Sequence, residues 1–265
     1  MPARLRAAAV SDVGEFRTVN QDAAFAASWG AGVADGVGGG PAGDLASAAL
    51  LHRLVVGAGP MRDAEQLAER VRWANWDIGA HARRDPALVG MATTFTGLWL
   101  SEAGSLLLAH TGDSRAYLWR DGALSRQTRD DSLVQALVDQ GILSAEEAAV
   151  DPRRNIITAS LGGGEEDVIS VAELEPVAGD RWLLCSDGVS DYVPFDELAR
   201  LLELAPTPER AAEWVVRVAL DAGTRDNATA VVCDVSTAPS GTVADASVRF
   251  AGAATARFAE GLESA

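Results

Sequence analysis

The stretch from Thr93 to Leu124, TTFTGLWLSEAGSLLLAHTGDSRAYLWRDGAL, decides the fold class of this 265-residue chain. It holds three apolar, strand-like segments separated by short polar or glycine-containing links: Thr93 to Leu100, Ser105 to His110 and Arg115 to Trp119. Asp121-Gly122 then predicts a hairpin turn that leads to Leu124. Because strands joined by such short links pair antiparallel, the stretch predicts an antiparallel sheet.

The pattern outside this stretch adds further strands and two groups of helices. Apolar residues three or four positions apart predict helices from about Ala42 to Val56 and from about Asp63 to Arg83. The remaining expected elements are strands Leu5 to Ser11, Ala23 to Ser28, Ala31 to Ala34, Val168 to Leu174, Arg181 to Ser186 and Thr229 to Val235, and helices at Ser132 to Gln140, after Ser144 and after Thr207-Pro208. Clustered helices beside antiparallel strands predict an α+β fold, not an alternating βαβ chain.

Composition and charge exclude several classes of protein. The chain is 48% hydrophobic and 23% charged, as expected of a globular protein with a sizeable core. It carries 22 basic and 38 acidic residues, a formal net charge of −16. Such a surface repels phosphate backbones and anionic lipid, so we expect neither nucleic acid nor membrane as a partner.

The chain also has the features expected of a cytoplasmic protein. No stretch approaches the ~18 uninterrupted apolar residues of a membrane-spanning helix. The basic start, residues 1–6, is followed by only four apolar residues, too few for a signal-peptide core. Cys185 and Cys233 both lie in apolar, strand-like segments and are expected to be buried thiols in a reducing compartment.

The composition changes after Ser236, where small residues replace the large apolar ones. We expect residues 237–265 to be a flexible tail or to form one short amphipathic helix through Ala254, Phe258 and Leu262.

Four aspartates stand where an apolar strand begins or ends, and each precedes Gly, Ser or Asn: Asp35, Asp113, Asp187 and Asp226. A carboxylate in such a place loses hydration and needs a cation or hydrogen bonds in compensation. Oxygen ligands with no His or Cys beside them suit a hard divalent cation. The spacing alone leaves two interpretations open, ordinary Asp-Gly turns or one shared cation site.

Two neighbouring features favour a site. Gly36 lets its backbone carbonyl approach a ligand closely. Arg17 is an isolated cation in the segment RTVNQD, and its guanidinium suits bidentate binding of a phosphate. Taken alone, Arg17 would equally fit a surface ion pair.

Seven stretches in this order resemble bacterial members of one enzyme family: SDVGEFRTVNQDA from Ser11, ADGVGG from Ala34, ATTF from Ala92, TGDSRAY from Thr111, RNIITASLG from Arg154, LLCSDGV from Leu183 and RDNATAVV from Arg225. The family is the metal-dependent Ser/Thr protein phosphatases (PPM, protein phosphatase 2C type). The resemblance covers Leu5 to about Val235, and the ordered set is far more specific than any single stretch.

The resemblance implies a four-layer α-β-β-α sandwich of two antiparallel sheets flanked by helices. One phosphatase domain would span residues 1–236, with a small flap insertion at about 129–155, and the tail would follow at 237–265. The implied substrates are phosphorylated proteins, products of a Ser/Thr kinase, and the expected state is a monomer.

The resemblance also implies the residues that bind metal. Asp35 would bridge two Mg²⁺ or Mn²⁺ ions, and the carbonyl of Gly36 would bind one of them. Asp187 and Asp226 would hold the other ion, and Asp113 with Asp187 would form a weaker third site. A hydroxide between the two ions would attack phosphoserine or phosphothreonine directly, without a phosphoenzyme.

Arg17 would hold the phosphate and complete the catalytic set with Asp35, Asp187 and Asp226. Three residues would lie next to the metal ligands without binding the ions directly: Gln21, Asp22 and Asn227. Many relatives carry Glu where this chain has Gln21, so we expect one ion to keep more water.

No general acid can be identified from the sequence. Eukaryotic relatives carry a His just after the first metal motif, where this chain has Val37-Gly38. The three histidines, His52, His81 and His110, lie in predicted helices or a strand and are expected to be structural.

Three alternatives remain open at this stage. Gly38, Gly40 and Gly43 match the dinucleotide-binding pattern GxGxxG, with Asp63 20 residues beyond, although no βαβ unit follows. A degenerate family member could bind phosphoproteins without turnover, as the Gln21 departure allows. A structural Ca²⁺ protein is disfavoured because no DxDxDG loop occurs.

Overall fold

The computed structural model of the chain describes residues 3–37, 42–237 and 247–257. Its strands are β1 (Ala3–Asp12), β2 (Asp22–Ala26), β3 (Gly30–Asp35), β4 (Phe95–Leu100), β5 (Leu106–Thr111), β6 (Arg115–Arg120), β7 (Ala123–Arg126), β8 (Ser170–Leu174), β9 (Arg181–Cys185), β10 (Ala228–Thr237) and β11 (Arg249–Gly252). Its helices are α1 (Gly43–Val55), α2 (Ala64–Arg84), the short 3₁₀ helix η1 (Pro86–Leu88), α3 (Leu133–Asp139), α4 (Ala145–Val150), α5 (Asp187–Ser190), α6 (Phe195–Leu204) and α7 (Pro208–Asp221).

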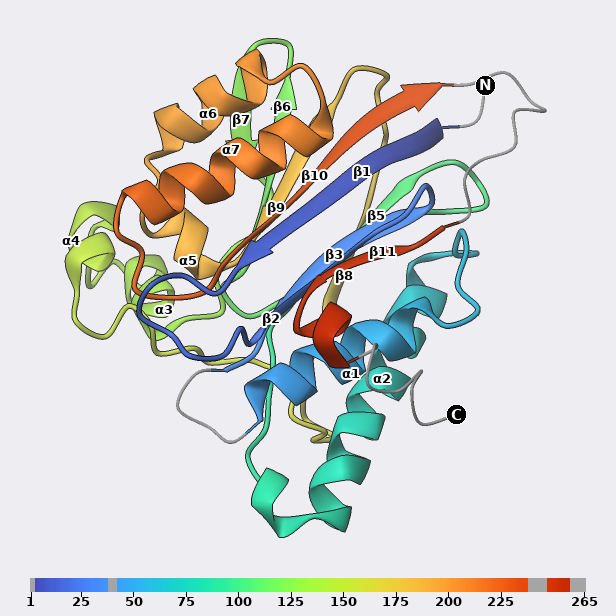
Figure 1. Cartoon of the computed structure of the whole chain (residues 1–265), viewed down its shortest axis with the longest axis vertical. Coiled ribbons are helices and arrows are strands. Elements are labelled where there is room, and N and C mark those ends of the chain that lie inside the picture. The colour runs from blue at the N-terminus through green and yellow to red at the C-terminus, as the bar shows by residue number, and fades with distance from the viewer. Residues whose placement is uncertain (1–2, 38–41, 238–246, 258–265) are drawn as a thin grey trace.

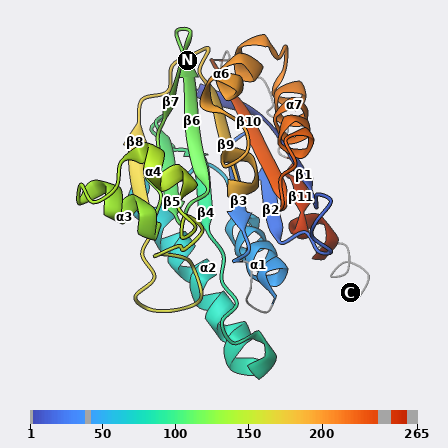
Figure 2. The same cartoon turned by 90° about the vertical axis from the view of Figure 1, so that its left-hand side faces the viewer.

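The strands form two antiparallel sheets that pack face to face (Figure 1). One sheet has the order β1-β10-β9-β6-β7, and the other has the order β11-β2-β3-β4-β5-β8. Helices α6 and α7 cover the outer face of the first sheet, and α1 and α2 cover the outer face of the second (Figure 2). The predicted four-layer α-β-β-α sandwich is confirmed, and the antiparallel pairing of β2, β3 and β4 excludes the dinucleotide-binding fold.

The alternation of side chains along the strands explains the four layers. In β9, Trp182 and Leu184 point between the sheets, whereas Leu183 and Cys185 point toward α6 and α7. Both faces of this strand are buried, so both sets of positions are apolar. The expected burial of Cys185 and Cys233 is confirmed, and both thiols are free.

Several helices begin where the capping residues predict. The side chain of Asp63 accepts a hydrogen bond from the Gln66 amide at the start of α2, and Ser144 with Glu147 forms a capping box at the start of α4. Thr207 caps α7 in the same way, with Pro208 in the first helical position.

The C-terminal segment corrects one expectation. β11 pairs antiparallel with β2, from Arg249 opposite Ala26 to Gly252 opposite Ala23. Residues 253–257 are helical, whereas Phe258 and Leu262 lie outside the described residues. For residues 249–252 the expectation of a flexible tail or a helix is therefore wrong, because this segment completes an edge of the second sheet.

Candidate active site

A cavity of about 330 Å³ gathers the strand-end residues singled out in the sequence. Its walls include Arg17, Asp35, Gly36, Val37, Thr94, Asp113, Asn155, Ile157, Asp187 and Asp226. Four aspartates from distant parts of the chain therefore face one space.

Each aspartate is placed by the end of a strand. Asp35 is the last residue of β3, and Asp113 lies in the short turn between β5 and β6. Asp187 is the first residue of α5, directly after β9, and Asp226 lies just before β10. The second sheet thus provides one side of the cavity and the first sheet provides the other.

The backbone around Asp35 and Gly36 is fixed by the neighbouring strand. The Asp35 amide donates to Thr94 Oγ1 at 3.1 Å, and the Thr94 amide donates to the Asp35 carbonyl at 2.8 Å. A Cβ on Gly36 would lie 2.3 Å from the carbonyl oxygen of Gly43. Only glycine fits at this position, and Gly36 forms part of the cavity wall.

Asp187 shows that the cavity needs a positive partner. Its Oδ1 atom is buried and has no hydrogen-bond partner among the described residues. A Cβ on Gly188 would lie 1.9 Å from the carbonyl oxygen of Asn227, so the backbone after Asp187 is packed tightly against the chain that carries Asp226. A buried carboxylate oxygen held rigidly without a donor is suited to a cation.

Burial and the charges of neighbouring carboxylates raise the pKa values of four aspartates in or behind the cavity wall: Asp22, Asp35, Asp113 and Asp187. Burial is the main cause, and it raises the pKa of Asp22 to about 6 and that of Asp113 to about 7. The pKa values of Asp35 and Asp187 are raised well above the usual range by burial, followed by the charges of neighbouring aspartates. A divalent cation would offset both causes, because it supplies the missing positive charge.

The carboxylates surround the cavity rather than meeting at one point. Among the described residues, no three His, Cys, Asp or Glu side chains converge closely enough to chelate one ion by themselves. Mg²⁺ usually keeps several waters and binds only one or two carboxylates, so spaced oxygen donors suit it. The donor set, four carboxylates and one accessible carbonyl, fits hard divalent ions.

Arg17 lies on the cavity wall next to Asp226. Its Nη2 donates to Asp226 Oδ2 at 2.7 Å, and its Nε donates to the Arg225 carbonyl at 3.3 Å. Its Nη1 makes no hydrogen bond to the described part of the chain, which leaves a donor for a ligand in the cavity.

The three supporting residues lie behind the cavity wall. Asp22 accepts a hydrogen bond from Ser186 Oγ at 2.7 Å, one residue before Asp187. Asn227 accepts from the Gln21 amide at 2.8 Å. The side-chain amide of Gln21 packs against Gly43, where a Cβ would lie 2.9 Å from Gln21 Nε2, so Gln21 does not line the cavity.

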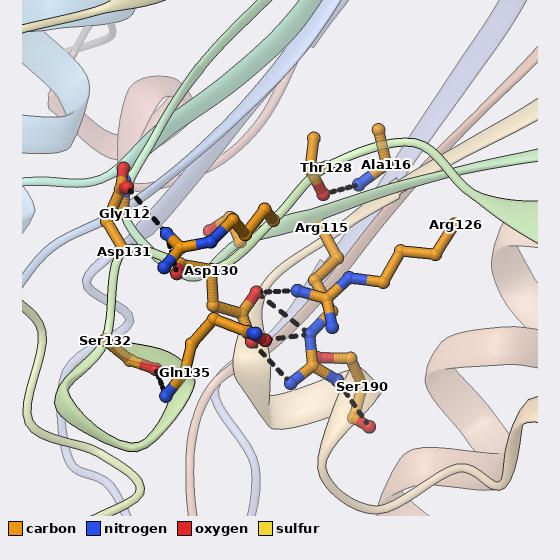
Figure 3. A network of polar contacts seen from close by, with 12 residues as sticks. Gly112, Arg115, Ala116, Arg126, Thr128, Asp130, Asp131, Ser132, Gln135 and Ser190 are labelled. Atoms are coloured by element: carbon orange, nitrogen blue, oxygen red, sulfur yellow. Dashed lines mark hydrogen bonds and ion pairs between the residues drawn. The ribbon is translucent and has the colours of Figure 1, made fainter. Parts of the chain in front are cut away.

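A buried ionic network joins the expected flap to the same carboxylates. Figure 3 shows Asp130 between the guanidinium groups of Arg115 and Arg126. Arg115 Nη1 also donates to the Ser190 carbonyl of α5 at 3.4 Å. Asp131 exchanges hydrogen bonds with Gly112, at 2.7 and 3.0 Å, beside Asp113. The segment that leads into α3 and α4 is therefore anchored on both sides of Asp113.

The histidines lie outside the acidic cavity. His110 is buried, with Nδ1 2.9 Å from Thr96 Oγ1 and Nε2 2.9 Å from the Arg129 carbonyl oxygen. His52 and His81 line a groove between α1 and α2.

Sequence reasoning did not single out Thr94, Asn155 and Ile157 as cavity residues. All three lie in stretches that carry the family resemblance, ATTF and RNIITASLG, and this was the available signal.

The described part of the chain holds no helix that combines the length and apolar character needed to span a membrane.

Comparison with known proteins gives the class to which this fold and cavity belong. No family model matches the chain. The serine/threonine protein phosphatase PstP of Mycobacterium tuberculosis is 40% identical over 235 residues, 87% of this chain and 45% of that protein. The chain thus spans about half the length of its mycobacterial relatives. The serine/threonine phosphatase stp of Listeria monocytogenes is 32% identical over 210 residues, 76% of this chain and 82% of that protein.

A solved structure agrees with these relatives. The catalytic domain of a PstP phosphatase, crystallised with two manganese ions, matches with a TM-score of 0.80 and 38% identity, and the match covers 89% of this chain and 100% of that one. The fold is thus that of the metal-dependent Ser/Thr protein phosphatases. The chain belongs to the bacterial PPM family, the protein phosphatase 2C type of Ser/Thr phosphatases.

Proposed function

We propose that this chain hydrolyses phosphoserine and phosphothreonine in proteins with the help of Mg²⁺ or Mn²⁺. The observation that carries the proposal is the convergence of four strand-end aspartates on one cavity that also contains Arg17. Relatives named Ser/Thr phosphatases support the substrate class.

The positions of the donors support the metal-binding roles that the family resemblance implies. Asp35 and the carbonyl of Gly36 would hold ions from the second sheet, and Asp187 with Asp226 would hold them from the first. Asp113 with Asp187 would provide a further, weaker position. The two manganese ions of the PstP complex support a count of two. When bound, such ions make water a nucleophile at neutral pH and offset charge on the transferring phosphoryl group.

The protein itself binds and orients the substrate phosphate. Arg17 would donate hydrogen bonds to its oxygens, while the ion pair with Asp226 keeps the guanidinium on the cavity wall. Because no histidine lines the cavity, the proton for the departing Ser or Thr oxygen would come from solvent.

A second candidate function is binding of phosphoproteins without turnover. The substitution of Gln21 for the Glu of many relatives favours it, and Gln21 is not among the described residues that line the cavity. The four aspartates that would bind metal are nevertheless all present.

Phosphate release from a phosphothreonine peptide, with Mn²⁺ and then with excess EDTA, separates the two functions. We expect turnover with Mn²⁺ that EDTA abolishes. Asp187→Asn should lower the rate by more than about 100-fold, because one ligand carboxylate is lost. Asp221→Asn, at the exposed end of α7, is the matched control and should keep the full rate. Peptide binding without phosphate release would favour the second function.

A further inference from the structure

Two loops meet at the rim of the acidic cavity, and each places one residue at the wall and the adjacent residue outside it. The inner residues are Arg17 and Asp226, whose side chains form an ion pair of 2.7 Å on the cavity wall. The outer residues are Phe16 and Arg225, with 5.4 Å between the guanidinium carbon and the ring centroid. The outer pair, Phe16 and Arg225, therefore lies directly beside the Arg17–Asp226 ion pair, on its solvent side.

The loop that carries Phe16 is held at both ends by one side chain. Asn227 Nδ2 donates to the carbonyls of Val13 and Val19, at 3.0 and 3.1 Å. Asn227 Oδ1 accepts from the Gln21 amide. A surface fixed before its ligand arrives loses little conformational entropy on binding.

Phe16 is exposed although it is a large apolar residue. Its exposed fraction is 57%, and that of Val19 on the same loop is 51%. Scattered exposed apolar residues are common and need no special role. Phe16 differs from these because it directly precedes Arg17 and its ring is held by a cation from a second loop.

We propose that Phe16 and Arg225 form a docking point for the polypeptide substrate, which rests on the proposed phosphatase function. An apolar side chain of the substrate packs on the Phe16 ring, within two residues of the phosphorylated one. Consecutive Cα atoms of an extended substrate are ~3.8 Å apart. Because Phe16 is adjacent to Arg17, a substrate side chain within two residues of a phosphorylated residue bound at Arg17 can reach the Phe16 ring. The N–H groups of Arg225 can donate to carbonyl groups of the same substrate.

The test compares two phosphothreonine peptides that differ only in the two residues on each side of the phosphothreonine, Leu in one and Gly in the other. Binding of the labelled peptides to Asp187→Asn protein is measured by fluorescence anisotropy, so the readout does not require turnover. We expect tighter binding of the Leu peptide. Adding Phe16→Ala should weaken the Leu peptide about five- to tenfold and remove the preference.

Two further measurements make the result specific. In the active protein, Phe16→Ala should lower kcat/KM for the Leu peptide relative to para-nitrophenyl phosphate, which has no flanking residues. Trp73→Ala, an aromatic residue on α2 with an exposed fraction of 61%, is the matched control and should change neither ratio nor affinity.

A retained preference for Leu in the Phe16→Ala protein would overturn the docking proposal, as would an equal loss for both peptides and para-nitrophenyl phosphate. The second result would mean that Phe16 only positions Arg17. Absence of any Mn²⁺-dependent hydrolysis by the unmodified protein contradicts the proposed function instead, while the anisotropy result still decides the docking claim.

Discussion

Asp187 shows at the scale of one residue what the cavity requires. Its Oδ1 atom is buried without a hydrogen-bond donor, and the tight packing of Gly188 on Asn227 prevents the backbone from moving away. A buried acceptor without a partner is costly, and a buried charge costs more. A divalent ion bound at Asp187 would remove both costs.

The raised pKa values predict how stability depends on pH. Asp22 and Asp113 have pKa values of about 6 and about 7, above the ordinary 3.8, chiefly because they are buried. Between the ordinary and the raised values, the folded state binds more protons than the unfolded state, so the free energy of unfolding falls as pH rises. We expect the melting temperature in EDTA to fall from about pH 4 to about pH 7, and Mn²⁺ to raise it most at the upper end.

Two variants serve as controls for this pH dependence. Asp113→Asn removes one raised group and should flatten the fall in melting temperature. Asp221→Asn changes an exposed residue at the end of α7 and should leave the fall unchanged. A melting temperature that rises over this range in EDTA and ignores Mn²⁺ would contradict the explanation.

Arg17→Ala should act mainly on substrate binding. In the proposed role the guanidinium would contact phosphate in both the bound substrate and the transition state, so its loss would raise KM more than it lowers kcat. We expect KM for para-nitrophenyl phosphate to rise ~10–100-fold, as for loss of charge-assisted hydrogen bonds. Steady-state kinetics measure this, with Arg72→Ala on the exposed face of α2 as control. A large fall in kcat at constant KM would argue against the role.

At the scale of elements, local chemistry predicted helix starts well. Ser144 and Thr207 each begin a helix as expected, and Asp63, expected as the first helical residue, is the cap of α2. All three side chains accept from the amide three residues ahead. α6 was not predicted. Its buried residues Leu198, Leu201 and Leu202 have helical spacing that was overlooked, and the helix begins after Pro194 without a side-chain cap to mark its start. β11 was not predicted either, since its pairing with β2 depends on residues more than 200 positions away.

The candidate site, like the secondary structure, could be predicted only in part from the sequence. The four strand-end aspartates and Gly36 are visible in the sequence because acids and glycine break apolar segments. Thr94 and Ser186 lie in stretches that carry the family resemblance, but only the tertiary contacts show what each of them does. Thr94 binds the backbone of Asp35, and Ser186 donates to Asp22.

The ion pairs of Asp130 with Arg115 and Arg126, at the start of the segment expected to be a flap, predict how that segment is stabilised. Asp130→Ala leaves the partly buried Arg115 and Arg126 without their shared carboxylate. We expect the free energy of unfolding to fall by about 3–5 kcal/mol, as when one partner of a buried ion pair is removed. Urea denaturation measures the change.

Asp139→Ala is the matched control for this measurement. Its exposed carboxylate pairs with Arg129 on the same flap, so its loss should have little effect. If Asp130→Ala lowered the free energy of unfolding no more than Asp139→Ala does, the buried network would not stabilise the fold.

At the scale of the whole molecule, the C-terminal segment reaches back to the site. Gly252 ends β11 with a φ of 65°, and a Cβ there would lie 2.2 Å from the carbonyl oxygen of Asp22. Asp22 pairs with Asp35 across β2 and β3, so the edge of the sheet and the cavity wall share one backbone region.

Gly252→Ala tests this connection. The substitution adds a clash and a strained φ, and we expect it to lower the free energy of unfolding by about 1–3 kcal/mol. Ala251→Gly, one residue earlier in β11, is a control for a change in the same strand without a clash. Thermal unfolding in EDTA measures both variants, and an unchanged melting temperature for Gly252→Ala would contradict the contact.

In the proposed function, acids at the ends of strands in both sheets jointly hold a pair of divalent ions. A manganese anomalous difference map from crystals grown with Mn²⁺ locates such ions. We expect two strong peaks between Asp35 on one side and Asp187 and Asp226 on the other. A map without peaks in this cavity, from a protein that still releases phosphate in the same Mn²⁺ buffer, would contradict it.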